Sequence, residues 1–498
     1  MKNQGKERLF QYLAIVGSAF AACRPIFDTD LWWHLTVGRW ILSHGQIPNV
    51  DYWNLFGAGK PWRAYSWLPE IVIAHAYSLG SEHGLVLLKL LVALLLSASV
   101  ISSFATLAKD RFVGTCLGLM VIAALSENLA LRPQTLSWMF LVLLIPNLEQ
   151  LCNKELVRTS SIKIFLLMAV WANTHITTVF GIAVTFVWCL EREPRRNLIR
   201  ALRISAIALA GTFCTPYFGG EWLTAENKAL HPILHQSIAE FQPTTIFNYQ
   251  GGILGILFVL LIATTSSQTI VKNIPRLILV SGFFVLALTA IKWIPYAAIL
   301  TASLVATIWG SNQGVDFGKI GEHITQLRYG LARIPSVLLV FVTLVLVGRS
   351  AQRLVSTPIQ RDAFPTAAVD FILQHKLPHP VLNIFGDGGY LIFRFSDEQG
   401  NPIHTVPIDG RTNVNDPKVM LAHEAAFSGI GDWKQYFTIV NPGTVLWRSG
   451  LPLESFLALH SVWCSVYRDH PESHSLDTQG WVVFVQKDQD YEGICEKR

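Results

Sequence analysis

Charged residues are scarce in this chain of 498 residues: Asp, Glu, Lys and Arg make up 15% of it. Soluble domains average about 25%. Hydrophobic residues account for 51% of the chain. So little charge cannot cover an ordinary globular surface with solvated groups, and so much apolar material is not typical of a disordered chain. The composition therefore excludes a disordered protein and a simple soluble enzyme, and it indicates an integral membrane protein.

Cysteine is also sparse, and its spacing predicts no metal site. The seven cysteines form neither a C-x-x-C pair nor a metal-binding spacing with histidine. Five lie in or beside apolar stretches, where a small buried side chain is the simplest interpretation. Cys464 and Cys495 share the polar C-terminal part, and they could pair in an oxidising compartment. The chain has no dense run of Lys and Arg, so nucleic acid is not an expected partner.

Long apolar stretches dominate the first two thirds of the chain. A helix needs roughly 20 apolar residues to cross about 30 Å of hydrocarbon. A shorter stretch, 67–79, predicts a helix along the outer membrane interface. The sequence thus predicts about eleven spans, at 9–23, 85–107, 112–126, 135–151, 162–175, 178–190, 199–213, 252–265, 277–291, 294–309 and 334–347.

Basic residues are unevenly distributed among the connections between these stretches. The first span follows Lys2, Lys6 and Arg8 and shows no small-residue cleavage site, so we expect a retained span. With the N-terminus in the cytoplasm, most Lys and Arg residues fall in cytoplasmic connections, as the positive-inside rule requires. This predicts an extracytoplasmic C-terminus. The cytoplasmic connections are then 109–111, 153–163, 191–203, 272–276 and 311–333.

The composition changes after Val347. Residues from about 357 to 498 contain no apolar run of membrane length. Short apolar runs at 381–385, 405–408, 462–467 and 481–486 predict strands, and 366–374, 417–427 and 453–460 predict helices. This alternation favours a small α/β domain. The predicted organisation is a mainly α transmembrane bundle at 1–350, with a large first outer loop at 24–84, followed by a soluble extracytoplasmic α/β domain at 357–498.

The first outer loop carries two acidic residues immediately after the first span. Asp28 and Asp30 precede an aromatic segment that contains Trp32, Trp33 and His34. Carboxylates at a membrane boundary are costly, which favours a functional role. The alternative is that Asp28 or Asp30 only caps the helix that begins near Leu31. Spacing alone leaves both interpretations open.

Further polar residues lie at the predicted outer ends of later spans. If these ends converge, they would form a cavity with acidic, imidazole and cationic groups in one place. The alternative is that each of these residues has only a structural role. A histidine at a helix end can bind a backbone carbonyl, and a lysine can extend to the lipid phosphates. The residues are Arg132, Asn173, His175, Glu221, His231, His235, Glu240 and Lys292.

Four short motifs resemble those of the GT-C superfamily of integral membrane glycosyltransferases, most closely uncharacterised bacterial members. They are D-x-D-L-W-W-H-L at 28–35, W-A-N-x-H at 171–175, G-G-Y-L at 388–391 and D-G-R at 409–411. The resemblance implies a bacterial inner (cell) membrane protein that moves a sugar from a polyprenyl-phosphate donor. The implied acceptor is an extracytoplasmic glycan, lipid or protein, and the implied transfer inverts the anomeric centre.

The resemblance also assigns roles to particular residues. It implies that Asp30 is the catalytic base, with Asp28 as second choice or partner. Mg²⁺ or Mn²⁺ could bind Asp28 and Asp30, since carboxylate oxygens suit these ions. Lys292, followed by Arg132 and His175, is the candidate for holding the lipid phosphate. The full set of predicted substrate-binding residues is His34, Arg132, His175, Glu240 and Lys292.

Two alternatives to an enzyme remain at this stage. One is a transporter or flippase for lipid-linked saccharides, which usually carries charged residues near the bilayer midplane. The other is a non-catalytic assembly partner, which would tolerate loss of the acidic pair. In the soluble domain, the 386–389 segment could cradle a phosphate, although a plain tight turn is the simpler interpretation. Asp409 and Arg411 are expected to form a local pair that stabilises a turn.

Overall fold

The computed structural model describes residues 2–153, 158–190, 194–220, 222, 239–311, 319–469, 480–487 and 495. The chain forms two compact units. The helical unit comprises the described parts of 1–25, 83–225 and 238–358, and the mixed unit comprises those of 26–82 and 359–498. The predicted division assigned 24–84 to the membrane domain, whereas this segment shares the mixed unit with the C-terminal residues.

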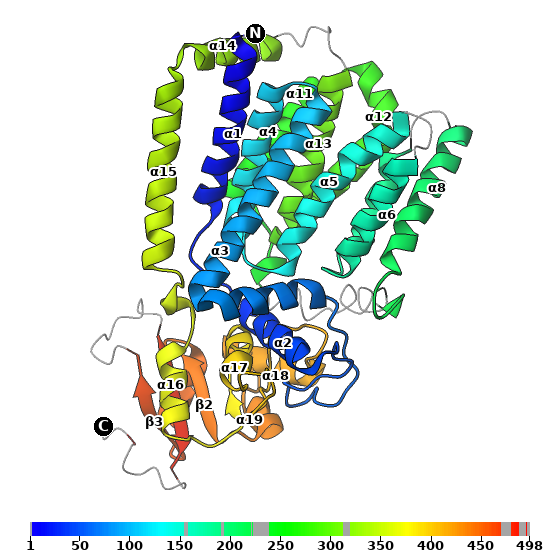
Figure 1. The fold of residues 1–498 in the computed structure, drawn as a ribbon. Helices are drawn as coiled ribbons and strands as arrows, with labels where there is room; N and C mark the ends of the chain where they lie inside the picture. Colours follow the sequence, from blue (N-terminus) through cyan, green and yellow to red (C-terminus); the bar gives the residue numbers. More distant parts are fainter. Residues whose placement is uncertain are drawn as a thin grey trace. The chain divides into compact units, whose positions relative to one another are not determined.

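Each of the eleven predicted apolar stretches corresponds to a helix (Figure 1). Five are long and apolar enough to cross a membrane, α3, α5, α12, α13 with the turn before it, and α15. Eleven crossings stay a prediction. The eleven helices are α1 (Lys2–Ala22), α3 (Trp67–Ala108), α4 (Arg111–Leu125), α5 (Pro133–Asn153), α6 (Arg158–Ala172), α7 (Thr178–Trp188), α8 (Pro194–Thr212), α11 (Tyr249–Thr264), α12 (Ser267–Thr289), α13 (Ile294–Ser311) and α15 (Ser336–Ser356). A further helix, α14 (Lys319–Arg333), lies in the connection before α15.

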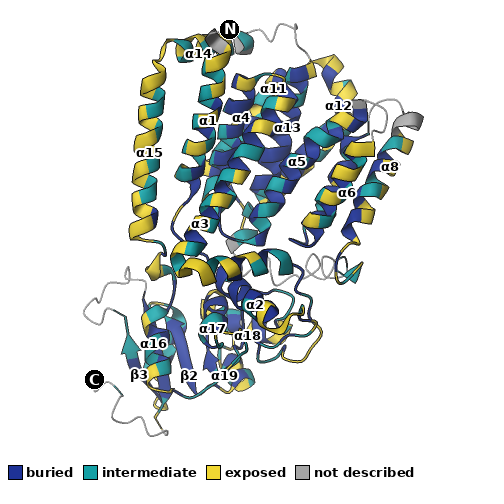
Figure 2. Cartoon of the chain, viewed as in Figure 1, coloured by how far each residue is buried: buried dark blue, intermediate teal, exposed yellow. Residues whose placement is uncertain are grey.

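Helix α13 forms the core of the helical unit. It is buried along almost its whole length, because α4, α5, α11 and α12 pack around it. Helix α15 is the opposite case, since it packs on α1 and leaves most of its apolar side chains exposed (Figure 2). Val337, for example, is 80% exposed and Phe341 is 60% exposed. An apolar surface of this kind is expected to face lipid.

A kink divides α3 into two helices. Gly80 and Ser81 have non-helical backbone angles, and the residues before them belong to the mixed unit. The predicted helix at 67–79 therefore exists as a separate segment that ends at the kink. Its position along a membrane interface stays a prediction.

The mixed unit contains a four-stranded sheet with the order β1-β2-β4-β3. Its strands are β1 (Val381–Leu382), β2 (Thr444–Arg448), β3 (Trp463–Arg468) and β4 (Trp481–Gln486). β1 pairs parallel with β2, and β4 pairs antiparallel with both β2 and β3. The accompanying helices confirm the predicted α/β character: α16 (Thr366–Gln374), α17 (Gly388–Arg394), α18 (Pro417–Ser428), α19 (Lys434–Val440) and α20 (Pro452–Ala458).

Two strand predictions differ from the structure. The predicted strand at 405–408 is absent as a named strand, because Val406 makes only an isolated bridge with Asn54. The inner strand β2 was not predicted, since five buried residues form too short a run to distinguish a strand from other buried structure. A disulfide joins Cys464 in β3 to Cys495, which settles the pairing that the sequence left open.

The first loop is built into the fold of the mixed unit. Its helix α2 (Asp30–His44) packs against α17. Val406 donates its backbone N–H to the Trp53 carbonyl at 2.9 Å, and Leu55 donates to the Val406 carbonyl at 2.8 Å. Hydropathy could not reveal this, because the partners lie about 350 residues apart in the chain.

A buried lysine holds the chain just after α1. Lys89 in α3 is 2% exposed, and its ammonium donates to the backbone carbonyls of Arg24 at 2.8 Å and Pro25 at 3.5 Å. These carbonyls follow the end of α1 and lie outside its hydrogen-bond ladder, so a side-chain donor can satisfy them. Lys89 therefore fixes the path of the chain just before the first loop.

We expect Lys89→Met to lower stability by about 1–3 kcal/mol, because a buried carbonyl without a donor carries its full desolvation cost. Thermal unfolding of the purified protein in detergent would measure the loss. Lys60→Met is the matched control, since Lys60 is exposed. Equal unfolding midpoints for the two variants would contradict this role of Lys89.

Candidate functional site

The acidic pair lies at the start of α2, and its two carboxylates have different environments. Asp28 is 4% exposed, and its Oδ1 accepts a hydrogen bond from the backbone N–H of Asp30 at 3.0 Å. Asp30 is the first residue of α2 and is half-buried. Neither aspartate is the N-cap of α2, which is Thr29 without a side-chain cap; Asp28 instead closes a turn just before the helix. The side chain of Asp30 is the more accessible of the two.

Asp30 lies against the D-G-R motif from the other end of the sequence. A Cβ atom added at Gly410 would stand 2.0 Å from Asp30 Oδ1, which is too close for any side chain. Gly389 of the G-G-Y-L motif is similarly close to the loop, because its Cβ would stand 2.5 Å from the Thr29 carbonyl oxygen. The two late motifs therefore form walls around the turn that carries the acidic pair.

The segment 386–389 begins in a tight turn, as the simpler interpretation expected, and a phosphate cradle there stays a prediction. Residues Phe385–Asp387 form a 3₁₀ turn that leads directly into α17. The backbone of the first loop occupies the space beside Gly389, so the glycine serves close packing of two chain segments. Asp387 is fully buried; its Oδ2 accepts from the Trp481 indole at 2.8 Å, and its Oδ1 has no hydrogen-bond partner among the described residues.

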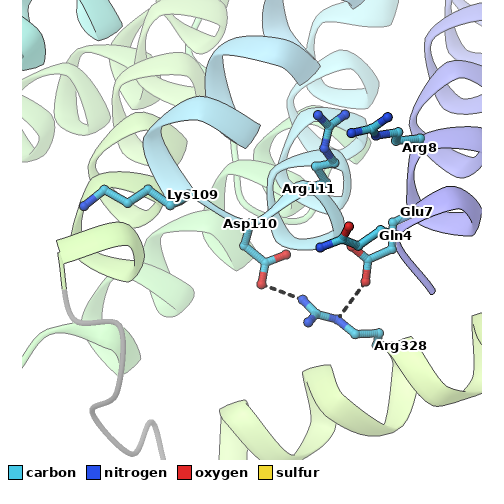
Figure 3. A pocket seen from close by; sticks show the side chains of 7 residues that line it. All are labelled: Gln4, Glu7, Arg8, Lys109, Asp110, Arg111 and Arg328. Atoms are coloured by element: carbon cyan, nitrogen blue, oxygen red, sulfur yellow. Dashed lines mark hydrogen bonds and ion pairs between the residues drawn. The ribbon is translucent and has the colours of Figure 1, made fainter. Parts of the chain in front are cut away.

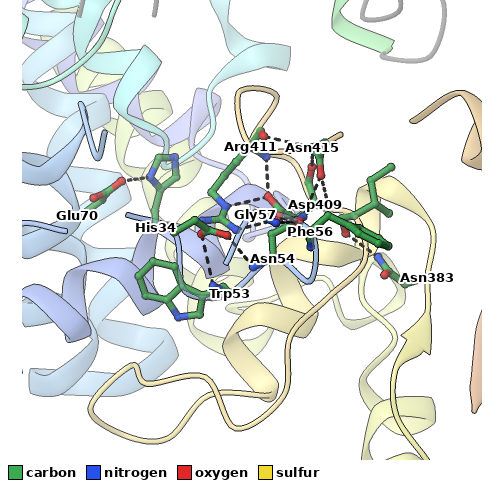
Figure 4. A network of polar contacts seen from close by, with 12 residues as sticks. His34, Trp53, Asn54, Phe56, Gly57, Glu70, Asn383, Asp409, Arg411 and Asn415 are labelled. Carbon is green, nitrogen blue, oxygen red and sulfur yellow. Dashed lines mark hydrogen bonds and ion pairs between the residues drawn. The ribbon is translucent and has the colours of Figure 1, made fainter. Parts of the chain in front are cut away.

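A buried ion cluster joins the first loop to the D-G-R motif (Figure 4). Arg411 donates from Nη1 to Asp51 Oδ1 at 2.5 Å, and from Nε and Nη2 to the two oxygens of Asp409 at 2.9 Å each. All three residues are at most 2% exposed. Burial lowers the pKa of Arg411, but Asp409 and Asp51 more than offset this effect and hold the pKa above its usual value.

Two amides complete this cluster. Asn54 donates to Asp409 Oδ2 at 3.2 Å and to Asn415 Oδ1 at 3.2 Å. Asp51 in turn accepts from the Asn54 backbone N–H at 2.9 Å. The sequence predicted the Asp409–Arg411 pair as a local feature, and the structure adds Asp51 as a partner from the first loop. The sequence signal for this contact was only that Asp51 is one of several carboxylates in that loop.

His34 is part of a buried pair. Its Nδ1 lies 2.9 Å from Glu70 Oε1, and both side chains are at most 7% exposed. Glu70 lies in the part of α3 before the kink, so this pair joins α2 to that helix. His34 is one helical turn from Asp30, on the same face of α2. The structure therefore gives His34 a packing partner, and its predicted contact with substrate stays a prediction.

Three of the other predicted site residues lie in one cluster of the helical unit. Arg132 forms an ion pair with Glu240, and both side chains are partly exposed. Phe241 follows Glu240, and the ammonium of Lys292 lies 3.2 Å from the centroid of its ring. A backbone hydrogen bond from Ile291 to Gln242 at 3.0 Å joins the two short segments. The structure thus places Arg132, Glu240 and Lys292 on segments that contact one another, and the predicted cavity stays a prediction.

His175 makes a more local set of contacts. Its Nδ1 lies 2.9 Å from the hydroxyl of Thr177. Asn173 donates to the carbonyls of Ala169 and Cys214, which ties two helix ends together. Glu221, His231 and His235 lie outside the described residues. Over the part of the chain that is described, no group of three or more His, Cys, Asp or Glu side chains is placed to hold a metal ion.

The fold is similar to that of two solved membrane glycosyltransferases. One is the archaeal oligosaccharyltransferase AglB from Archaeoglobus fulgidus in complex with an inhibitory peptide and a dolichol-phosphate. It is 10% identical with a TM-score of 0.56, and the match covers 88% of this chain and 69% of that chain. The other is ArnT from Cupriavidus metallidurans bound to undecaprenyl phosphate, 15% identical with a TM-score of 0.52 and 98% coverage of both chains.

One of these structures holds a dolichol-phosphate and the other undecaprenyl phosphate, and the likeness confirms the fold expected from the short motifs. No family model matches the chain, and no curated protein matches it. Together with the apolar helices, the shared fold identifies an integral membrane protein. At these levels of identity the likeness shows the fold, and the roles of individual residues stay predictions.

The buried carboxyl of Asp387 predicts a pH dependence of stability. Burial raises its pKa from 3.8 to about 6, although Arg448 and the Trp481 hydrogen bond oppose the shift. The folded state therefore holds this proton more tightly than the unfolded chain does. The contribution of the protonated Asp387 carboxyl to the free energy of unfolding is complete below pH 3.8 and is lost as the pH rises through about 6.

Asp387→Asn cannot ionise, so its free energy of unfolding should not show this loss. The difference in stability between the variant and the wild type should therefore shift by about 3 kcal/mol in favour of the variant from low to neutral pH. Chemical unfolding of the purified protein at about pH 4 and about pH 7.5 would measure the difference. The exposed residue Asp362 offers the control variant Asp362→Asn. Parallel stability profiles for the wild type and Asp387→Asn would show that Asp387 does not titrate in this way.

Proposed function

We propose that this protein is a glycosyltransferase that moves a sugar from a polyprenyl-phosphate donor to an acceptor outside the cytoplasm. The observation that supports this most strongly is the position of Asp30. It begins α2 on a turn fixed by Asp28, and its carboxylate lies against Gly410 of the D-G-R motif. This arrangement occurs in a chain that has the fold of polyprenyl-phosphate-dependent glycosyltransferases.

Asp30 acts as the base in this proposal. A carboxylate can take the proton from an acceptor hydroxyl as that oxygen attacks the anomeric carbon of the donor. The bond between the anomeric carbon and the phosphate oxygen breaks in the same step, and the polyprenyl phosphate leaves with the electron pair. One base and one displacement invert the anomeric centre. Asp28 is a positioning residue, because its hydrogen bond to the Asp30 backbone sets the turn.

Cationic groups are needed where charge develops on the leaving phosphate. Lys292 remains the first candidate, followed by Arg132 and His175. The contacts of Arg132 and Lys292 support the first two, because Arg132 pairs with Glu240, Lys292 lies on the ring of the next residue, Phe241, and both cations are partly exposed. Glu240 would then hold Arg132 in place until the phosphate binds.

A divalent cation is a second way to stabilise that charge. Asp28 and Asp30 supply carboxylate oxygens of the kind that Mg²⁺ and Mn²⁺ prefer. Asp28 Oδ1 accepts from the Asp30 backbone N–H, which holds the two carboxylates on one turn. Such an ion would supply positive charge beside the leaving phosphate. Activity after treatment with EDTA, with and without added Mg²⁺ or Mn²⁺, would show whether transfer requires one.

The Cys464–Cys495 disulfide supports an extracytoplasmic location of the mixed unit, because disulfides persist in oxidising compartments. The uneven distribution of Lys and Arg supports a cytoplasmic N-terminus in a bacterial inner membrane. The acceptor would then be a glycan, a lipid or a protein on the outer side.

Asp30→Asn should abolish sugar transfer while leaving expression and the unfolding midpoint close to those of the wild type. An amide keeps the shape of the side chain but cannot accept the proton. Release of sugar from a panel of radiolabelled polyprenyl-phosphate sugars by the purified protein, with acceptor extracts supplied, would measure this. Asp362→Asn changes an exposed carboxylate in the same unit and serves as the control.

Undiminished transfer by Asp30→Asn would exclude Asp30 as the base. Donor binding without turnover by both proteins, despite added acceptor, would contradict the enzyme proposal itself. That outcome would favour a transporter or flippase, or a non-catalytic assembly partner.

Gly410→Ala should reduce transfer strongly without unfolding the protein. The new methyl group would stand where Asp30 Oδ1 now lies, and the end of a side chain can move away at small cost in stability. The carboxylate would then leave its working position, and a displacement of about 1 Å can cost roughly 100-fold in rate. Gly386→Ala is the control, because its Cβ would meet nothing within 4 Å. Similar rates for both variants would show that contact with Gly410 does not place Asp30.

A further inference from the structure

A polar pocket lies within the helical unit, at the N-terminal end of α1 (Figure 3). Its volume is about 410 Å³, which falls within the usual range of small-molecule sites, about 300–1,000 Å³. Helix α1, the connection between α3 and α4, and helix α14 contribute its walls. The residues are Gln4, Glu7, Arg8, Lys109, Asp110, Arg111 and Arg328.

The charges that line this pocket do not balance. Four of the lining residues are cationic and two are anionic, a net charge of +2. Arg328 occupies both carboxylates, at 3.4 Å from Glu7 Oε1 and 2.5 Å from Asp110 Oδ2. The other oxygen of Asp110 caps α4 by accepting from two backbone N–H groups. The carboxylates therefore have little remaining capacity to neutralise the other cations.

Two of these cations face each other. The guanidinium groups of Arg8 and Arg111 point toward one another in Figure 3. Arg111 donates to the Gln11 side chain at 3.1 Å, and Arg8 makes no ion pair with any described carboxylate. Two like charges directed at the same space repel each other. An anion between them would be attracted to both and would offset that repulsion. Arginine presents a planar set of donors that matches phosphate oxygens.

The position of the pocket suits a ligand from the membrane surface. Apolar stretches of α1 and α4 begin next to it, with Phe10 and Phe112 in ring contact at 6.0 Å. Helix α14 lies on the pocket and exposes Leu327 and Tyr329 at 62% each beside its charged residues, as interfacial helices do. The first loop follows the opposite end of α1, which is about 31 Å long.

We propose that this pocket binds a phosphate-bearing anion on the side of the membrane predicted to be cytoplasmic. Arg8 and Arg111 hold the phosphate oxygens, and Arg328 fixes the far wall by bridging Glu7 and Asp110. The same phosphate chemistry is available from the headgroup of an anionic phospholipid and from a free phosphate. This site is separate from the residues that we propose for sugar transfer, and it does not depend on that proposal.

The test uses the full-length protein purified in a neutral detergent, with unfolding midpoints as the readout. Dioleoylphosphatidylglycerol, dioleoylphosphatidylcholine and inorganic phosphate are added in separate arms. Native mass spectrometry counts the bound lipids. The test variant is Arg8→Gln/Arg111→Gln. The control, Arg203→Gln/Lys272→Gln, removes the same charge from exposed positions on α8 and α12.

The phosphatidylglycerol arm should raise the midpoint of the wild type and the control, whereas the Arg8→Gln/Arg111→Gln variant should bind roughly 30-fold more weakly. Its midpoint without ligand should equal that of the wild type, because both arginines are exposed. An effect of phosphatidylglycerol alone identifies a lipid headgroup. An equal effect of inorganic phosphate identifies a free phosphate as sufficient. An equal response of the test and control variants, or of the phosphatidylcholine arm, would overturn the proposal.

Discussion

The ion cluster around Arg411 is the constraint on which the rest of the mixed unit depends. A buried guanidinium is costly unless carboxylates pair with it, and here Asp409 and Asp51 do so from segments 358 residues apart in the chain. The rings of Trp53 and Trp62 lie 5.6 Å and 5.1 Å from the guanidinium and exclude water from it. The first loop can therefore take only the path that brings Asp51 to Arg411.

That path determines the surroundings of the acidic pair. Gly410 lies between the two residues of the D-G-R motif that form the ion cluster, so the cluster fixes its backbone. The backbone of Gly410 in turn lies against Asp30, and Gly389 lies against Thr29. Motifs from the two ends of the chain thus form one structural element. The late motifs act through backbone positions that leave room for the acidic turn, and their own side chains need not contact substrate.

Much of the fold could be predicted from the sequence, because the apolar stretches and the polar connections between them show where helices begin and end. The eleven apolar stretches and the strands at 462–467 and 481–486 correspond to observed elements. Contacts between distant segments could not be predicted in this way. Asp51 and Arg411, or Trp53 and Val406, meet through the tertiary fold, and neither hydropathy nor spacing encodes such a pairing. The glycines of 386–389 illustrate the same point, since a glycine that accommodates a neighbouring chain segment and a glycine that accommodates a phosphate look alike in sequence.

Burial explains why the two arginine clusters of this protein have different consequences. Around Arg411 the side chains are shielded from water, so every charge and donor must find a partner within the protein, and the cluster serves structure alone. Around Arg8 and Arg111 the side chains reach solvent, so water can compensate an excess of positive charge and the fold does not require it to be neutralised. An accessible excess of one sign remains available to a ligand of the other sign. The proposed anion site beside α14 follows from this difference, because Arg8 and Arg111 are exposed where Arg411 is buried.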